Sequence, residues 1–357
     1  MIVDIVKVFI PSTIGFFFGI LLAFLLSHYL YKYQMWKKKA GKKQFNGDDT
    51  PIFNNLHKDK EVGTPKMGGV LIWASVALTT ITVYILSKIL PTDLTDKLVF
   101  LSRNQTWIPF TTLILGGLVG FIDDYMEVKG TSDNAAGGLS LKKRLIVVSL
   151  IALCVSLWFY LKLGVSTIGI PFVGDLQIGF LFIPLFIAVT LGIYSGGVID
   201  GLDGLAGGIF AAIFTAYAGI AFYQTQINLA AFCATVVGAI LAFLWFNIPP
   251  ARFYMSETGS MALTITLAVV AFMTDSKGGG HGVLALPIIA LPLVVTSLSD
   301  VIQVLSKKYR NGKKIFLVAP IHHHFEALGW PAYKVTMRFW VIGIVFAIIG
   351  MIFGLTG

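Results

Sequence analysis

The sequence predicts an all-α integral membrane protein with about ten transmembrane helices. Hydrophobic residues make up 56% of its 357 residues and charged residues 13%, whereas soluble domains average about 45–50% and about 25%. The mean hydropathy is +0.81. The apolar residues also gather in runs of the length that a helix needs to cross a bilayer, about 20 residues. This composition excludes a soluble enzyme, a disordered chain and a disulfide scaffold. We therefore expect residues 1–357 to form one polytopic membrane domain.

Ten apolar stretches follow one another along the chain. They cover residues 12–30, 68–88, 106–122, 145–163, 178–199, 204–223, 228–247, 259–274, 282–305 and 337–355. The first is too long for the apolar core of a signal peptide, so we expect it to be retained as a span. Pro287 and Pro292 lie in the ninth stretch, and because proline removes a helical hydrogen bond, we expect this helix to be kinked or broken. Between the fourth and fifth stretches, residues 165–177 alternate weakly in polarity around glycine and proline, which favours a small hairpin.

The distribution of Lys and Arg predicts the orientation of the chain. With ten spans both termini lie on one side, and the alternate loops form the other side. These loops are residues 31–67, 123–144, 200–203, 247–258 and 306–338, and they contain 21 of the 27 basic residues. Because cytoplasmic loops are enriched in Lys and Arg, we expect them to face the cytoplasm and both termini to lie outside, in the periplasm. The basic run from Lys32 to Lys43 is typical of a cytoplasmic anchor that touches anionic lipid.

The acidic residues on this predicted cytoplasmic side gather at the ends of apolar helices. The clusters are Asp123 and Asp124 in GFIDDY, Asp200 and Asp203 in VIDGLDG, Glu257 in MSETGS, and His322, His323 and His324 in APIHHHFE. A carboxylate at membrane depth costs about 2.5–3.5 kcal/mol on insertion scales. Helix capping explains a single residue such as Asp203. Two acidic pairs, a further Glu and three His on one face favour a functional site instead.

These residue types suit phosphoryl transfer that depends on Mg²⁺. This ion is usually held by one or two carboxylates together with substrate phosphates, and phosphoryl transfer depends mainly on positioning and charge neutralisation. Glycines such as Gly201 and Gly204 let a ligand approach the backbone closely, although small residues also serve helix packing. Three adjacent His do not match a zinc pattern.

Seven motifs, in order along nearly the whole chain, resemble the phospho-N-acetylmuramoyl-pentapeptide transferase family, within the polyprenyl-phosphate N-acetylhexosamine-1-phosphate transferase superfamily. They are GTPKMGG (63–69), GFIDDY (120–125), DGLDGLA (200–206), FNIPPA (246–251), ETGS (257–260), APIHHHFE (319–326) and RFW (338–340). The DDY and DGLDG elements are common to the superfamily, and APIHHHFE favours the muramoyl-pentapeptide branch.

The resemblance implies a multi-pass enzyme of the bacterial inner membrane whose active site faces the cytoplasm. Such an enzyme transfers phospho-MurNAc-pentapeptide from UDP-MurNAc-pentapeptide to undecaprenyl phosphate, which gives lipid I and UMP. The resemblance also implies Mg²⁺ as the cofactor and a location within the lipid bilayer. Because the family is commonly dimeric, it further implies a homodimer. We expect no nucleic-acid partner.

The resemblance also implies roles for individual residues. Catalytic roles fall on Asp123, Asp124, Asp200, His322, His323 and His324. Substrate contacts fall on Lys60, Asn247, Asp203, Gln303, Arg144 and Ser260. The metal ligands would be Glu257 and Asp200.

Several positions depart from the family pattern. Glu257 replaces an Asp, and Arg144 replaces a Lys. Two Asn of the family pattern are replaced by Tyr194 and Gly197. The Lys of DDYxK is replaced by Glu127, and Lys129 lies two residues further on. The Thr that follows GTP is replaced by Lys66. Glu61 replaces the Lys ahead of GTP, with Lys60 beside it. Several groups that position the substrate have therefore changed or moved along the chain.

Two other functions remain open on the sequence alone. One is a transferase of the same superfamily that uses UDP-GlcNAc or a related sugar. The other is a transporter or a substrate-binding pseudoenzyme, because broken helices are common in transporters. The acidic clusters lie at helix ends and not at the membrane midplane, which favours the transferase.

Overall fold

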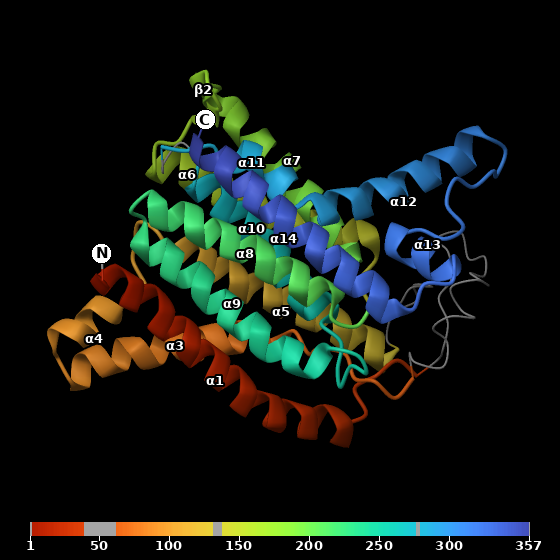
Figure 1. Ribbon diagram of the computed structural model, residues 1–357, viewed down its shortest axis with the longest axis horizontal. Helices are drawn as coiled ribbons and strands as arrows, with labels where there is room; N and C mark the ends of the chain where they lie inside the picture. Colours follow the sequence, from red (N-terminus) through yellow and green to blue (C-terminus); the bar gives the residue numbers. More distant parts are fainter. Residues whose placement is uncertain (1, 39–61, 131–137, 276–278, 357) are drawn as a thin grey trace.

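The computed structural model describes residues 2–38, 62–130, 138–275 and 279–356 (Figure 1). Its long helices are α1 (Ile2–Lys32), α3 (Val70–Ile89), α5 (Trp107–Lys129), α6 (Leu141–Lys162), α7 (Phe182–Ser195), α8 (Leu205–Tyr223), α9 (Ile227–Asn247), α10 (Ser256–Met273), α12 (Leu291–Tyr309) and α14 (Ala332–Thr356). The shorter elements are α4 (Asp93–Leu98), α11 (Gly282–Ile289), α13 (Ile321–Ala327), the 3-10 turns η1 (Gly179–Leu181) and η2 (Gly196–Ile199), and the strands β1 (Thr167–Ile170) and β2 (Gly174–Gln177).

The helices confirm an all-α, multi-pass membrane protein. Nine helical segments in the described part of the chain are long and apolar enough to cross a bilayer, and α11 with α12 forms a tenth span if the bent pair is counted as one. Both termini lie at the end of the bundle where α4 and the hairpin lie, and α13 lies at the opposite end (Figure 1). This placement agrees with an even number of crossings.

The predicted break in the ninth span is confirmed. Helices α11 and α12 meet at Ala290 with a bend of 70°. Pro292 lies in the first turn of α12, where its missing amide hydrogen costs nothing because that position has no helical acceptor. As a result α12 points away from the bundle (Figure 1), and its middle contacts the start of α13, where Ser299 Oγ accepts from the amide of Ile321 at 2.9 Å.

The predicted hairpin is also confirmed. Strands β1 and β2 pair antiparallel, with Ile168 opposite Leu176. Asp275 attaches the hairpin to the start of α11, since its carboxylate accepts hydrogen bonds from the amides of Gly169, at 2.7 Å, and Val283, at 2.9 Å.

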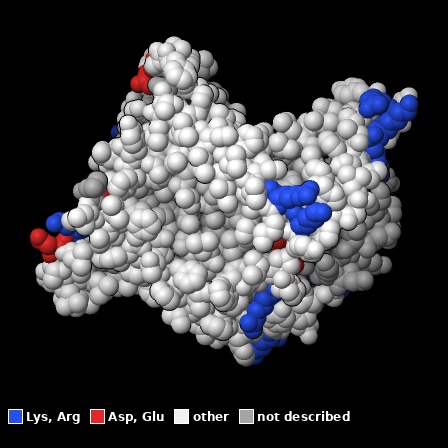
Figure 2. Space-filling model, viewed as in Figure 1, with Lys and Arg blue, Asp and Glu red and all other residues white. Residues whose placement is uncertain are grey.

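On the face shown in Figure 2, the charged side chains lie at the two ends of the molecule. Figure 2 shows Lys and Arg around the end where α12 and α13 lie, separated by a broad uncharged surface from the few charges at the opposite end. Large apolar side chains such as Phe17 and Leu21 on α1 and Ile344 on α14 are exposed, as expected for helices that face lipid.

Helix α10 forms the centre of the bundle. In its most apolar stretch 89% of the residues are buried, against 28% for α1 and α14. Helix α5 approaches it closely through glycine, because a Cβ atom at Gly120 would overlap the backbone carbonyl of Glu257. Small residues allow this kind of backbone contact between membrane helices. The acidic end of α5 is therefore held against the first turn of α10.

We predict that Gly120→Ala forces α5 and α10 apart and lowers stability by about 1–3 kcal/mol, the usual cost of overpacking. It should also reduce the transferase activity that the motif resemblance implies, because Asp123 and Asp124 follow Gly120 on α5. Thermal unfolding in detergent and an assay of that expected activity measure the two effects. Gly192→Ala is the matched control, since a Cβ atom there meets nothing within 4 Å. Equal behaviour of the two variants would contradict the packing argument.

Candidate active site

The first turn of α10 brings two of the acidic motifs together. The amide of Ser256 donates to Asp200 Oδ2 at 2.7 Å, and the amide of Thr258 donates to Asp124 Oδ2 at 2.9 Å. The Thr258 hydroxyl adds a second donor to the same Asp124 oxygen at 2.6 Å. The amides at a helix N-terminus lack helical acceptors and favour negative charge. The helix end therefore stabilises carboxylates from α5 and from the 200–204 turn beside its own Glu257.

Arg144 connects Asp123 at the end of α5 to Glu257 in the first turn of α10. Its guanidinium binds Asp123 through Nε, 3.1 Å from Oδ1, and Nη2, 2.8 Å from Oδ2. Its Nη1 lies 2.5 Å from Glu257 Oε1. The amide of Leu139 also donates to Asp123 Oδ1, at 2.7 Å, so the fully buried Asp123 is held on both oxygens. The Tyr194 hydroxyl interacts with the same guanidinium.

Two departures from the family pattern face each other in the structure. Lys66 Nζ, in the loop before α3, lies 2.7 Å from Glu127 Oε2 at the end of α5. Burial alone would lower the pKa of Lys66, but Glu127, Asp124 and Glu257 together raise it above the ordinary lysine value. A raised pKa means that the stabilising charge is present at neutral pH and is lost only as the pH rises through that value. The basic group missing at position 127 is therefore supplied from position 66.

The turn between α7 and α8 is held by a buried amide. Asn247 Oδ1 accepts from the amide of Gly204 at 3.0 Å, and Asn247 Nδ2 donates to the carbonyl of Phe253 at 2.9 Å. The Asp203 carboxylate accepts from the amide of Ala251 at 3.1 Å. The N-cap of α8 is Gly204, which has no side-chain cap, so Asp203 joins two loops instead of capping this helix.

Two of the three predicted His lie against this turn. They belong to the short helix α13, and a Cβ atom at Gly201 would be 2.8 Å from His323 Nε2 and would overlap His322 Nε2. His323 Nδ1 lies 2.7 Å from Glu326 Oε2, which orients the imidazole. His324 lies differently, since its Nδ1 accepts from the amide of Leu317 at 3.2 Å. Its ring also packs against Phe316.

The remaining predicted residues are placed as follows. Gln303 holds the segment after α12, accepting from the amides of Ile315 and Phe316 at 3.1 and 3.0 Å and donating to the Phe316 carbonyl at 2.8 Å. Ser260 Oγ makes a long 3.5 Å hydrogen bond to Glu257 Oε2. Lys60 and Glu61 lie outside the described residues. Thr258 is a site residue that our sequence analysis missed, although its place in ETGS at a helix start was a usable signal.

The carboxylates fit a Mg²⁺ ion that takes further ligands from a substrate. The described residues contain no group of three or more His, Cys, Asp or Glu arranged around one metal position. However, Mg²⁺ bound beside phosphates needs only one or two protein carboxylates. Asp124 Oδ1 is buried and lacks a hydrogen-bond partner among the described residues, which is costly unless a cation or a proton joins it.

Comparison with known proteins defines the class of this membrane protein. The model of glycosyl transferase family 4 matches residues 106–275, which include α5 to α10 and most of the acidic motifs. Together with the fold and the site, this match defines a membrane-bound sugar-phosphate transferase.

Relatives at higher identity define the family. The chain is 37% identical to the phospho-N-acetylmuramoyl-pentapeptide-transferase of Geobacillus sp. strain WCH70 over 295 residues, 82% of this chain and 84% of the relative. Its identity to the Chloroflexus aurantiacus protein of the same name is also 37%, over 304 residues, 82% of this chain and 77% of that protein. The Listeria innocua protein is 35% identical over 296 residues, 82% and 85% of the two chains. The chain belongs to the phospho-N-acetylmuramoyl-pentapeptide-transferase family, whose members act in peptidoglycan synthesis.

We predict that Lys66 and Glu127 act as one unit. Lys66→Glu places two carboxylates beside Asp124, and Glu127→Lys places two ammonium groups together, so each single variant should lose at least roughly tenfold in activity. The double variant restores the ion pair in reverse and should recover much of this loss. Coupling between contacting residues is commonly about 0.5–3 kcal/mol.

The control for this double-mutant cycle is the exposed pair of Lys97 and Asp93. These two side chains lie 3.9 Å apart and are 52% and 100% exposed, and such surface pairs contribute little. The rate of the sugar-phosphate transfer in all variants measures the coupling. Additive losses at positions 66 and 127 would show that the two residues act independently.

Proposed function

We propose that the chain transfers phospho-MurNAc-pentapeptide from UDP-MurNAc-pentapeptide to undecaprenyl phosphate, giving lipid I and UMP, with Mg²⁺ as cofactor. The observation that supports this most directly is the convergence of Asp124, Asp200 and Glu257 at the first turn of α10, with Arg144 and Lys66 beside them. Carboxylates and fixed cations next to one another are the groups that phosphoryl transfer between two phosphates needs. The names of the curated relatives favour this substrate over UDP-GlcNAc.

We also propose that the site faces the cytoplasm of a bacterium, across its inner membrane, with both termini in the periplasm. The loops at the site's end of the bundle contain 21 of the 27 basic residues, and an excess of Lys and Arg is typical of cytoplasmic loops. UDP-linked sugars are cytoplasmic, so this orientation places the site where its substrate is made. A homodimer remains a prediction from the family resemblance.

In the proposed reaction an oxygen of the lipid phosphate attacks the phosphorus next to the sugar. A new P–O bond forms, the bond to the oxygen bridging the two phosphates of UDP breaks, and UMP leaves with that oxygen. Asp124, whose Oδ1 lacks a partner among the described residues, accepts the proton if the lipid phosphate arrives protonated. Asp123 fixes Arg144 by two contacts, so that its charge is preorganised near the phosphates.

The basic groups have separate parts in this proposal. Lys66 and Arg144 reduce the repulsion between the two anionic substrates. His322 and His323, against the backbone of Gly201, donate to phosphate or sugar oxygens of the nucleotide. Glu257 and Asp200 hold Mg²⁺, which neutralises charge on the diphosphate when bound.

The direct test is UMP release by the purified full-length protein. We expect release with UDP-MurNAc-pentapeptide, undecaprenyl phosphate and Mg²⁺ together, and none when any of the three is omitted or when Mg²⁺ is chelated. Parallel reactions contain UDP-GlcNAc in place of the muramoyl substrate. Release with UDP-GlcNAc alone would assign the chain to the related sugar-1-phosphate transferases, and no release with any UDP-sugar would overturn the enzymatic proposal.

The metal assignment predicts a graded response at Glu257. Glu257→Gln keeps the size of the side chain but removes its charge, so Mg²⁺-dependent turnover should fall by roughly 10²-fold or more. Glu257→Asp keeps the charge and should retain activity, with a changed Mg²⁺ concentration for half-maximal rate. Measuring rate against Mg²⁺ concentration distinguishes the variants. A fully active Gln variant would place the metal elsewhere.

A further inference from the structure

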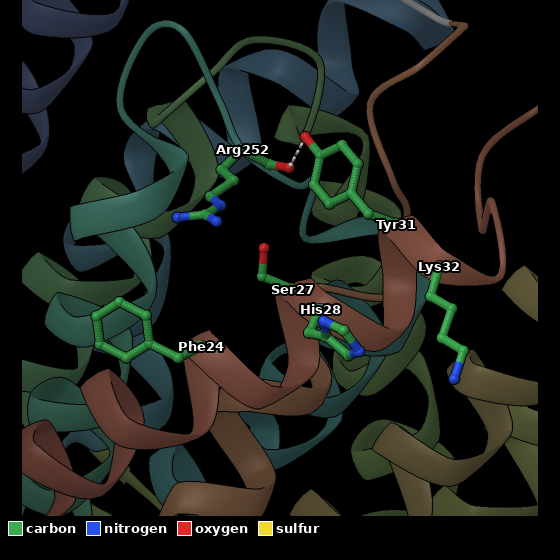
Figure 3. A pocket seen from close by; sticks show the side chains of 6 residues that line it. All are labelled: Phe24, Ser27, His28, Tyr31, Lys32 and Arg252. Carbon is green, nitrogen blue, oxygen red and sulfur yellow. Dashed lines mark hydrogen bonds between the residues drawn. The ribbon is translucent and has the colours of Figure 1, made fainter.

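An open recess lies on the outside of the bundle, between the end of α1 and the loop from α9 to α10 (Figure 3). Its volume is about 360 Å³, and its walls are formed by Phe24, Ser27, His28, Tyr31, Lys32 and Arg252. Five of these residues come from the last turns of α1. Only Arg252 comes from a distant part of the sequence, so the recess depends on the tertiary fold.

The walls of the recess are joined by specific contacts. Phe24, Ser27, His28 and Tyr31 recur at the spacing that places side chains on one face of a helix. The Tyr31 hydroxyl donates to the backbone carbonyl of Arg252 at 3.0 Å (Figure 3), and the Arg252 amide donates to the Phe246 carbonyl at 2.8 Å. These two hydrogen bonds place the start of the Arg252 side chain against α1.

The chemistry of the recess is that of an anion site. Its lining contains Arg252, Lys32 and His28 and no acidic residue. Ser27 is 2% exposed, its hydroxyl oxygen has no hydrogen-bond partner among the described residues, and it points into the recess (Figure 3). A buried hydroxyl without a partner is costly. A phosphate oxygen would satisfy it and would suit the guanidinium of Arg252.

The surface next to the recess favours a lipid over a free anion. Phe17, Leu21 and Phe24 are between 57% and 63% exposed and follow one another at helical spacing along α1, away from its basic end. An acyl chain attached to a phosphate in the recess would lie along these side chains. An inorganic phosphate or a soluble acidic peptide would leave them uncovered.

The recess also adjoins the candidate active site through the backbone. The amide of Ala251 donates to the Asp203 carboxylate, whereas the side chain of the next residue, Arg252, lines the recess. The loop between α9 and α10 therefore carries Arg252 in the recess and, one residue earlier, the amide that binds Asp203. Groups bound by Arg252 would restrain the backbone that holds Asp203.

We propose that this recess binds the phosphate head group of an anionic phospholipid of the bilayer, and that this lipid orders the loop between α9 and α10. The proposed site uses none of the residues that we assign to catalysis or to the substrate. Lipid binding can therefore be measured apart from the reaction proposed above, although the same loop holds Asp203.

The test uses the full-length protein and native mass spectrometry with phosphatidylglycerol or phosphatidylcholine added at equal concentration. We expect the wild-type protein to retain phosphatidylglycerol in preference to phosphatidylcholine. Arg252→Gln and Lys32→Gln should each weaken this retention roughly fivefold, the effect of about one lost charge contact with lipid. Lys308→Gln, with the same charge change on α12, is the matched control and should bind as the wild type does.

Several outcomes would overturn the proposal. They are equal retention of the two lipids, unchanged retention in both recess variants, and an equal loss in Lys308→Gln. Displacement of the lipid by equimolar undecaprenyl phosphate would assign the recess to the substrate, and displacement by millimolar inorganic phosphate would show an anion site without lipid specificity. Thermal unfolding of each variant confirms that it is folded, and Lys32→Gln, at an exposed position, keeps the test valid if Arg252→Gln unfolds.

Discussion

The rest of the structure depends on one constraint, which is the placement of several carboxylates around the first turn of a buried transmembrane helix. Carboxylates removed from water need donors or cations in direct contact. Here the free amides of α10 serve Asp124 and Asp200, and Arg144 serves Asp123 and Glu257. These contacts require the ends of α5, α6 and the turn before α8 to meet at one point. The close packing of α5 on α10 through glycine follows from the same requirement, since a hydrogen bond to a helix end acts only over about 3 Å.

The parts of the fold that are encoded locally were predictable from the sequence. Apolar runs near 20 residues long gave the positions of the spans, and two prolines gave the break between α11 and α12. A weak alternation around glycine and proline gave the hairpin at residues 167–177. Each of these features depends on residues adjacent in the chain. These local patterns therefore predict the spans, the break and the hairpin without knowledge of how the helices are arranged.

The partners of the site residues were not predictable in the same way. Arg144 was expected to touch substrate, but no sequence motif indicates that it binds Asp123 and Glu257 at once. Asn247 and Gln303 were assigned to substrate contacts, and the structure shows their amides bonded to backbone that shapes the site. The three adjacent His were treated alike, yet α13 turns His324 toward a different loop from His322 and His323. Such distinctions depend on side-chain direction and on contacts between separate segments, from 7 residues apart for His324 and Leu317 to 113 for Arg144 and Glu257, which spacing alone does not encode.

The ion pair between Lys66 and Glu127 has a consequence for how such a chain can diverge. A comparison made one position at a time scores two radical replacements, whereas in space the two new charges lie 2.7 Å apart and neutralise each other. A chain with only one of the two residues would have an unpaired charge near Asp124. Either substitution would therefore be difficult to reverse while the other is present. Family members in which this exchange has occurred are better identified by paired positions than by the conservation of either position alone.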